Sequence, residues 1–433
     1  MSGARGRERE KTMFTVEPQE FSRALKIMMT ARARLSSRPI LTGALLNAAP
    51  GRLEISATDL ECGARYTIDG AGIQGNESFS AIVDPAPIIK AIGKARAPIG
   101  LEIGENGYTL TIRNNGSSIL LTSDKVEDFP SLPKAPAGGA RLPWTDFQAL
   151  IGRVEHAGAR ESTRYALNAI YLKAAGGRLE AAATDGRRLA IETIDIEAGA
   201  DFAALLPLSA VRLIKKAKLP KETIVEITAT GSAAIIAGEA EETENTETET
   251  DTIGRPGIFI TAGPLVLSAL KVEGHFPPVH DVIPDAPALR FTIPAAPFVA
   301  ALDQAKALLK DSEITSMRLY FSGGAVSVLA NNNEGQRAEA KIQTADMVDT
   351  RPARVIEPDP AEFAKNGVFE EHWPCGQCVD EPFDIRFNPA FLLEAIKAGG
   401  AENVTLAMDR PDTPAILYGA GEYRDIIMPI HIV

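Results

Sequence analysis

The stretch Ala183-Thr184-Asp185-Gly186-Arg187-Arg188-Leu189-Ala190 decides the fold, because two related stretches occur elsewhere in the chain. An earlier one reads Ala57-Thr58-Asp59-Leu60-Glu61, and a degenerate later one reads Ala330-Asn331-Asn332-Asn333-Glu334. The copies are separated by the length of a whole domain rather than by a solenoid repeat of about 20–50 residues. The sequence therefore predicts three tandem domains. Because the Thr-Asp pair is shared between copies, it is typical of a structural turn.

Other landmarks recur in the same order. Phe129-Pro130, Phe276-Pro277 and Met428-Pro429 each close a repeat, and each repeat opens with a short strand and an amphipathic helix. A second helix, with a proline at or near its first position, follows at the midpoint. Alternating β-rich runs separate the helices. The expected helices cover about 18–31, 85–95, 144–157, 207–217, 295–309 and 389–398.

This pattern predicts an α+β fold of three tandem domains, each a pseudo-two-fold pair of one helix plus antiparallel strands. The expected boundaries are 13–137, 138–284 and 285–433, preceded by a disordered extension at 1–12. Two insertions are expected, an acidic one at 239–256 in the second domain and another at about 350–381 in the third.

The composition is that of an ordinary globular protein, with 45% hydrophobic and 24% charged residues. No apolar run is long enough to cross a bilayer, so no membrane partner is expected. The charged N-terminal residues lack the apolar segment of a secretory signal. Three cysteines do not make a disulfide framework, which favours a reducing cytoplasm.

Two of the cysteines, Cys375 and Cys378, form a Cys-x-x-Cys pair with His372 close by. One interpretation is a metal or redox site. The other is a pair of cysteines within a loop insertion, since a single such pair lacks the second half of a zinc site. We expect no metal and no cofactor.

The formal net charge is −12, but the acidic residues are concentrated locally. The tract Glu239 to Asp251 holds seven carboxylates and no base, and its low complexity is typical of a disordered loop. The helices are instead biased toward lysine and arginine. They include Arg23, Lys26, Lys90, Lys94, Arg96, Arg153, Arg212, Lys215, Lys216, Lys306, Lys310 and Lys397.

Two interpretations of the helix charges remain open. The helices could simply expose solvated faces, with cations favoured near their C-termini by the helix dipole. If the repeats instead place all six on one surface, that surface would be basic and would attract phosphates without reading bases. Periodicity alone does not decide between them.

The repeat, the helix charges and these motifs together resemble the bacterial sliding clamp, the β subunit of DNA polymerase III. The resemblance runs from Met13 to the C-terminus. It is closest at Pro39-Ile40-Leu41, at Arg164-Tyr165-Ala166-Leu167-Asn168 with the 183–190 stretch, and at Gly274-His275-Phe276-Pro277 and Ile427-Met428-Pro429-Ile430.

The resemblance implies a head-to-tail homodimer that forms a six-domain ring. Twelve helices would line a hole that encircles duplex DNA without sequence preference. The ring would tether the DNA polymerase III catalytic subunit, the clamp loader and other proteins with a clamp-binding motif, which makes replication processive. Such a protein is a non-catalytic processivity factor.

The resemblance also implies a client-peptide groove between the middle and last domains. An extended peptide with apolar anchors needs a small apolar pocket with a few polar groups on its rim. The matching positions are Leu167, Thr184, Gly186, Arg187, Arg188, Leu189, Pro277, Val282, Pro414, Ile426, Ile427, Met428, Pro429 and Ile430. Without the resemblance, Leu167, Ile426 and Met428 would be interpreted as core residues.

For the ring interface the resemblance implies Ile119 on one side, with Leu308 and Leu309 on the other. The DNA-facing positions would be Arg34, Arg38, Arg160, Arg164, Tyr165, Lys215 and Lys216. The chain departs from the family pattern in Ala166, where an aromatic is usual, in Asp281, where an arginine is common, and in one residue beyond the usual end. These departures fit a divergent second clamp.

The sequence fits two other classes of function less well. An enzyme is disfavoured because no glycine-rich phosphate loop, nucleophile elbow or histidine metal motif occurs. A peptide-binding repeat scaffold that does not encircle DNA is disfavoured by the helix charges. Its oligomeric state would distinguish the scaffold from a ring.

Overall fold

The computed structural model describes residues 14–75, 78–93, 95–160, 165–197, 199–230, 256–272, 274, 276–285, 287–309, 316–332, 334–350 and 383–430. Several predictions lie outside these residues. They concern the extension 1–12, the acidic tract 239–251, the insertion at about 350–381 with His372, Cys375 and Cys378, and the predicted DNA-facing Arg164.

One pattern, a strand, a helix and three further strands, occurs six times among the described residues. The first two copies are β1(Phe14–Val16), α1(Pro18–Ala31), β2(Ala44–Ala49), β3(Arg52–Thr58) and β4(Cys62–Asp69), then β6(Phe79–Val83), α2(Pro85–Ile92), β7(Ile99–Ile103), β8(Thr109–Asn114) and β9(Ser117–Thr122), with β5(Ile73–Gln74) between them. The next two are β10(Ala140–Pro143), α3(Trp144–Val154), β11(Ala169–Ala175), β12(Arg178–Thr184) and β13(Arg188–Asp195), then β14(Phe202–Pro207), α4(Leu208–Lys216), β15(Ile224–Ala229), β16(Pro256–Ala262) and β17(Leu265–Leu270).

The last two copies complete the chain. They are β18(Leu289–Pro294), α6(Ala295–Leu308), β19(Met317–Ser322), β20(Ala325–Asn331) and β21(Arg337–Gln343), followed by β22(Asp346–Asp349), then β23(Phe383–Phe387), α8(Pro389–Gly399), β24(Asn403–Met408), β25(Ala415–Tyr418) and β26(Arg424–Ile427). The prediction of one helix with a few antiparallel strands, repeated twice in each of three tandem domains, is confirmed.

The helix boundaries follow local chemistry. α2 and α8 each begin with a proline and are capped by Asp84 and Asn388, whose side chains accept hydrogen bonds from Ala86 N and Ala390 N, both at 2.9 Å. α2 ends earlier than predicted because Gly93 takes a φ of +44°. α4 begins at Leu208, so Pro207 is its N-cap rather than its first residue.

The chain packs into two compact units. Unit 1 is Met1–Ala183 with Thr193–Phe276, and unit 2 is Thr184–Glu192 with Pro277–Val433. Unit 1 contains two repeats because β17 of the second pairs with β4 of the first, in the sheet β10-β15-β16-β17-β4-β3-β2-β6. The boundaries predicted between the three domains therefore stay predictions.

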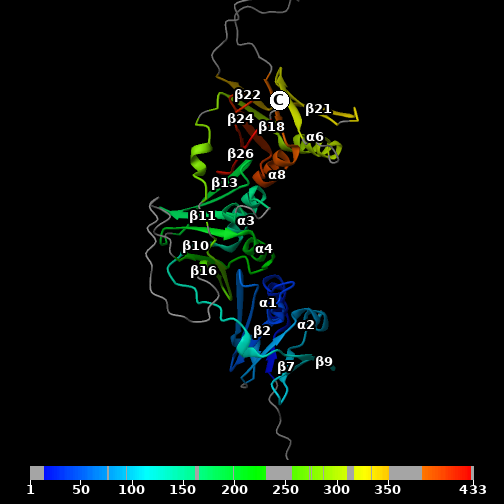
Figure 1. The fold of residues 1–433 in the computed structure, drawn as a ribbon, viewed down its shortest axis with the longest axis vertical. Helices are drawn as coiled ribbons and strands as arrows, with labels where there is room; N and C mark the ends of the chain where they lie inside the picture. Colours follow the sequence, from blue (N-terminus) through cyan, green and yellow to red (C-terminus); the bar gives the residue numbers. More distant parts are fainter. Residues whose placement is uncertain are drawn as a thin grey trace, which may run out of the picture. The chain divides into compact units, whose positions relative to one another are not determined.

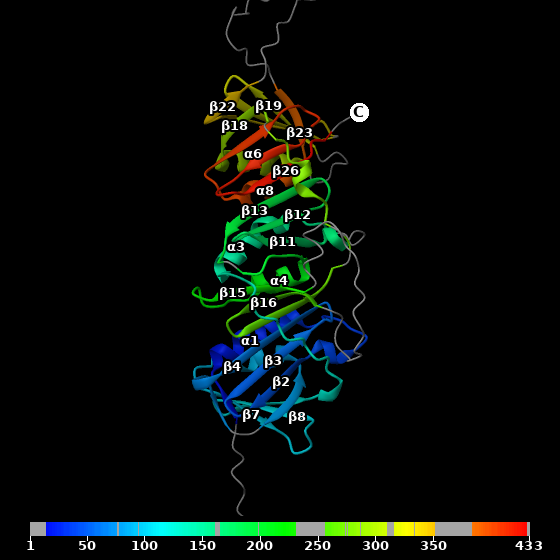
Figure 2. The ribbon, with the colours of Figure 1, turned by 90° about the vertical axis from the view of Figure 1, so that its left-hand side faces the viewer.

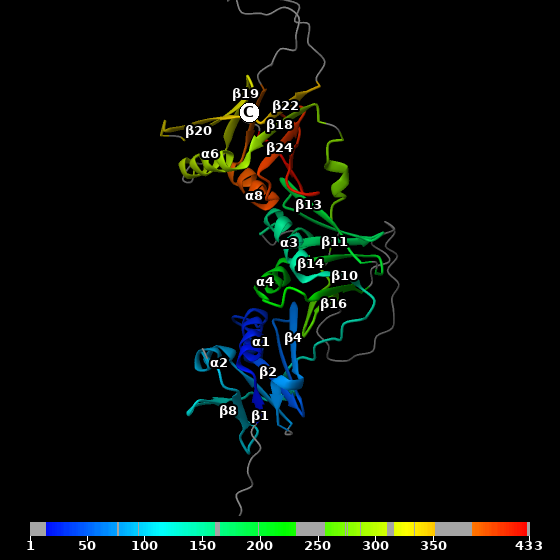
Figure 3. The same cartoon turned by 180° about the vertical axis from the view of Figure 1, so that it is seen from behind.

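In unit 1 the helices pack beside one another on the strands. α1 packs against β3 and β4 and also contacts α2 and α4. Its buried face includes Phe21, Leu25 and Met28, none of which is exposed to solvent. Figures 1 and 3 show α1, α2, α3 and α4 on the same side of β10, β11 and β16, and Figure 2 looks onto the strand side. The four described α-helices of unit 1 thus lie on a common side, whereas the interpretation drawn from the sequence concerned all six helices and stays a prediction.

Unit 2 includes most of the stretch 183–190 that defines the repeat. β13 pairs with β26, with Arg188 opposite Ile427 and Leu189 opposite Ile426, and the sheet continues through β25, β24, β18 and β22. A second sheet has the order β21-β20-β19-β23. α6 and α8 pack against each other, α6 against β20 and β21, and α8 against β25 and β26. The segment 184–192 is thereby built into the sheet of the C-terminal domain.

Candidate functional site

The Thr-Asp turn has the same hydrogen bonds in the first two repeats. Thr184 Oγ1 donates to the Arg188 carbonyl at 2.6 Å and accepts from Gly186 N at 3.1 Å. Asp185 Oδ1 accepts from the backbone N–H groups of Arg187 and Arg188, at 2.9 and 3.1 Å. In the first repeat Thr58 and Asp59 make the four equivalent bonds, at 2.7 to 3.0 Å. The prediction of a shared structural turn is confirmed.

The third residue of the turn has a positive φ in both copies. It is +86° at Gly186 and +78° at Leu60. A residue with a Cβ is strained in this region, whereas glycine is not. A Cβ on Gly186 would meet no atom within 4 Å, so the backbone conformation alone favours glycine there.

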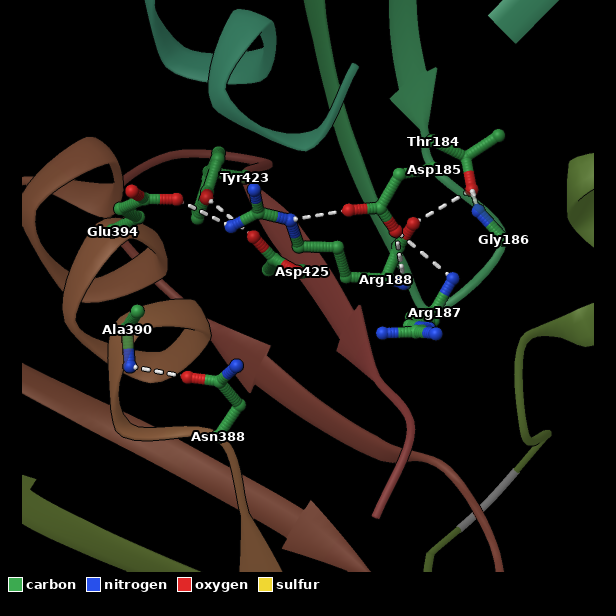
Figure 4. A network of polar contacts seen from close by, with 10 residues as sticks. All are labelled: Thr184, Asp185, Gly186, Arg187, Arg188, Asn388, Ala390, Glu394, Tyr423 and Asp425. Carbon is green, nitrogen blue, oxygen red and sulfur yellow. Dashed lines mark hydrogen bonds and ion pairs between the residues drawn. The ribbon is translucent and has the colours of Figure 1, made fainter. Parts of the chain in front are cut away.

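Arg188 distinguishes the middle copy from the first. Its side chain is 7% exposed, although the resemblance had placed it in the groove. Nε of Arg188 lies 3.1 Å from Asp185 Oδ2, and Nη1 lies 2.5 Å from Glu394 Oε2 on α8. Its guanidinium carbon is 4.3 Å from the centre of the Phe391 ring. Figure 4 shows the Arg188 side chain extended toward Glu394.

A second buried polar pair lies near this cation. Tyr423 donates its hydroxyl proton to Asp425 Oδ2 at 3.1 Å, and Asp425 is fully buried. Burial, followed by the charge of Asp425, raises the pKa of Tyr423 well above its ordinary value. The Arg188–Glu394 ion pair thus joins the turn to α8, whereas the Tyr423–Asp425 bond lies within the β26 region close to it (Figure 4).

The predicted groove residues of unit 2 fall into three groups by exposure. Thr184, Arg188, Leu189, Ile426 and Ile427 are buried. Gly186, Arg187, Pro277, Val282 and Met428 are exposed, and Pro414, Pro429 and Ile430 are half-buried. Leu167 lies in unit 1, in the short helix η5(Tyr165–Leu167), and is 6% exposed.

Two of the exposed groove residues have large apolar side chains, which are usually buried. Val282 is 53% exposed and Met428 is 43% exposed, and both are among the few large apolar side chains at the described surface. The segment that carries Met428 is held by its backbone. Met428 N donates to the Arg187 carbonyl at 2.9 Å, and Ile430 N donates to the Arg386 carbonyl at 2.8 Å.

The residues predicted for the ring interface lie in separate units. Ile119 is on β9, which forms one end of the sheet β5-β1-β7-β8-β9, next to Leu120 with 67% exposure. Leu308 is the last residue of α6 and is half-buried. Leu309 is only 2% exposed and belongs to the core of unit 2. Of the two leucines, Leu308 is the one that reaches the surface.

A basic cleft of about 700 Å³ lies on unit 1. It is lined by residues of α1, by the end of α2 and by the segment after α4. Its charged lining residues are all cations, namely Arg23, Lys26, Arg96, Lys216 and Lys218. Arg23 is paired with Glu20, whose carboxylate also accepts the Tyr66 hydroxyl at 2.7 Å. This arrangement can attract an anionic polymer through its backbone.

The other predicted DNA-facing residues are spread over unit 1. Arg34, Arg38, Arg160 and Lys215 are exposed, and Lys215 is paired with Glu155. Tyr165 begins η5, but its side chain is outside what the structure describes. Among the members of the predicted set that the structure describes, Lys216 alone lines the cleft.

Sequence reasoning missed several residues of both sites. Phe391, Glu394, Tyr423 and Asp425 surround Arg188 in space but not in sequence. In the cleft, Arg23, Lys26 and Arg96 had been noted as helix charges without a common location, and Lys218 lies just beyond the end of α4.

Neither a metal site nor a membrane span is found in the described part of the chain. No group of three or more metal-ligating side chains occurs there. Of the helices that are described, none is both long and apolar enough to cross a bilayer.

Comparisons with known proteins point to one family. Residues 141–247 match the central domain of the DNA polymerase III beta subunit. The beta sliding clamp of Pseudomonas aeruginosa is 21% identical over 425 residues, covering 97% of this chain and all of that protein. The beta sliding clamp of Salmonella typhimurium is 27% identical over 332 residues, covering 75% of this chain and 82% of that protein.

A solved structure shares the fold over the same length. The DNA polymerase sliding clamp from Bacillus subtilis superposes with a TM-score of 0.79 at 16% identity, covering 98% of this chain and all of that one.

Proposed function

Because the chain belongs to the family of bacterial DNA polymerase III beta subunits, the beta sliding clamps, we propose that two copies close head to tail into a ring around duplex DNA. The protein is a non-catalytic sliding clamp for DNA replication. The ring slides on DNA in the cytoplasm and tethers the DNA polymerase III catalytic subunit. A tether raises the local concentration of its client at the template without tight binding to DNA.

The observation that carries this proposal is the clamp fold over nearly the whole chain, with α1 to α4 on one face of unit 1. The all-cationic cleft supports a DNA-facing role for that face. Attraction to the phosphates does not depend on the base sequence of the DNA, and a clamp that slides along DNA needs this independence. Arg34, Arg38, Arg160, Arg164, Tyr165, Lys215 and Lys216 would face the same duplex, together with the newly identified cleft residues.

Client proteins would dock on unit 2 through a short clamp-binding peptide. The exposed apolar side chains of Val282 and Met428, with the prolines 277, 414 and 429, offer anchors for such a peptide. Arg187 and Gly186 would supply the polar rim and the open backbone. The polymerase, the clamp loader and other clamp-binding proteins would compete for this one site.

The subunits would join through strand edges. β9 ends its sheet in unit 1 and β21 ends a sheet in unit 2. An unpaired edge with an exposed leucine, such as Leu120, needs a partner strand in a soluble protein. Ile119 and Leu308 would contribute apolar contacts to the closed interface.

The mass in solution tests the ring. Light scattering after gel filtration should give twice the chain mass of 46.1 kDa at micromolar concentration. A stable monomer would contradict the ring and favour the alternative, a repeat scaffold that binds peptides without encircling DNA.

A further inference from the structure

The two Thr-Asp turns provide an internal comparison. They make the same four hydrogen bonds, and both have a positive φ at the third residue. Where the middle repeat has Arg188, the first repeat has Cys62. The turn therefore forms without an arginine, and Arg188 has to be explained by something other than the turn.

Burying Arg188 is costly, because a charge taken out of water must be fully paired. The structure pairs it on two sides. Asp185 lies on its own turn, whereas Glu394 and Phe391 both lie on α8. The guanidinium thus joins the turn to the helix. A hydrophobic residue could fill the same space but could not fix the direction of both partners.

The Thr184–Arg188 turn also fixes the segment that carries Met428. The Arg187 carbonyl accepts the Met428 N–H at 2.9 Å, one step beyond the β13–β26 pairing. Asp185 uses one oxygen for the amides of Arg187 and Arg188 and the other for the Arg188 guanidinium. A single carboxylate therefore links the anchored cation to the backbone beside the exposed Arg187 and Met428.

We propose that Arg188 is a positioning residue of the client-peptide site. Its buried guanidinium, held by Asp185 and Glu394, fastens the Thr184–Arg188 turn to α8 and so holds Arg187 and Met428 ready for the peptide. The proposal rests on the client-peptide function proposed above. Arg188 would thus act on the peptide indirectly, through the segments it holds, and not by touching the peptide.

The test compares Asp185→Asn with Asp59→Asn in the full-length protein. Each variant keeps a side-chain oxygen that can cap its turn, but only Asp185→Asn removes a charge from Arg188. The probe is a fluorescein-labelled peptide copied from the clamp-binding segment of the host's polymerase catalytic subunit. We expect Asp185→Asn to weaken the peptide Kd about tenfold, as for loss of a charge-assisted bond, and Asp59→Asn to leave it unchanged.

Glu394→Gln is the second variant, because it leaves the turn and the whole client-facing surface untouched. It should also weaken the peptide Kd, and it should speed hydrogen exchange of the Met428 amide by more than any loss of Tm accounts for. A merely structural role would lower Tm with no separate effect on that amide. Unchanged Kd in both Asp185→Asn and Glu394→Gln, or losses that only follow Tm, would overturn the proposal. Failure of the wild-type protein to bind the peptide would instead overturn the proposed function.

Discussion

Arg188 and Glu394 are 206 positions apart in the sequence, yet Nη1 of the arginine lies 2.5 Å from Oε2 of the glutamate. The arginine is 7% exposed and the glutamate side chain is 32% exposed. This ion pair joins the stretch that defines the repeat to the last helix of the chain. The middle repeat therefore differs from the first by an arginine that is buried and ion-paired.

Removing the arginine should destabilise unit 2. Arg188→Met leaves Asp185 and Glu394 without their shared cation, and we expect the free energy of unfolding to fall by about 2 kcal/mol. This loss is smaller than for a fully buried ion pair because the two carboxylates are partly exposed to solvent. Urea denaturation measures this. The control is Arg113→Met, which breaks an exposed pair with Glu102 and should cost less than about 1 kcal/mol. Equal losses in the two variants would show that the buried pair has no special role.

Tyr423 makes stability depend on alkaline pH. Burial and the Asp425 charge raise its pKa well above 10, so the folded chain keeps the phenolic proton at pH values where the unfolded chain has lost it. Its contribution to stability is therefore complete below about pH 10 and falls as the pH rises further.

Tyr423→Phe should flatten the decline of unfolding free energy between about pH 9 and pH 12, measured by urea titration at each pH. The pKa of Tyr66 is also raised, to about 12, so Tyr66→Phe should flatten part of the same decline through unit 1, whereas Tyr108→Phe, at an exposed position, serves as the control. A pH dependence identical to that of the wild type in Tyr423→Phe would rule out this role of the tyrosine.

The basic cleft should govern the salt dependence of DNA binding. If Lys26, Lys216 and Lys218 each neutralise one phosphate, changing one of them to glutamine should reduce the slope of log K against log salt by about 0.9. Fluorescence anisotropy with a duplex of arbitrary sequence provides the measurement. Lys271→Gln, an exposed lysine outside the cleft, should leave the slope unchanged. An equal change with Lys271→Gln would indicate general charge screening instead.

The C-terminal segment should be needed for clients and not for the ring. Deleting residues 428–433 removes Met428 and its hydrogen bond to the Arg187 carbonyl, but leaves β9, β21 and α6 intact. We expect the labelled peptide to lose detectable binding while light scattering still gives a dimer. Unchanged peptide affinity would remove Met428 from the client-peptide site.

The repeat could be predicted because its signals are local. Thr58 and Asp59, like Thr184 and Asp185, make all four hydrogen bonds of their turn to residues at most four positions away. The sequence pattern alone is therefore enough to indicate the turn. Helix starts at Pro18, Pro85 and Pro389 are equally local. The family resemblance, carried by the same motifs, pointed to the clamp fold.

The contacts of the site could not be predicted from spacing. Nothing near Arg188 in the sequence reveals that Glu394 and Phe391 bury its guanidinium. Leu309 follows an amphipathic helix, where a surface and a core position look alike, and it proves to be core. The cleft combines Arg96 and Lys218 from different repeats, which only the tertiary fold brings together.

Retention on circular DNA tests the central claim most directly. The full-length protein is loaded with the host clamp loader and ATP onto a nicked plasmid, separated by gel filtration, and the plasmid is then cut once with a restriction enzyme. A ring should remain with the circle through the column and leave after linearisation, since nothing but topology holds it there. Equal retention on circular and linear DNA would contradict encirclement.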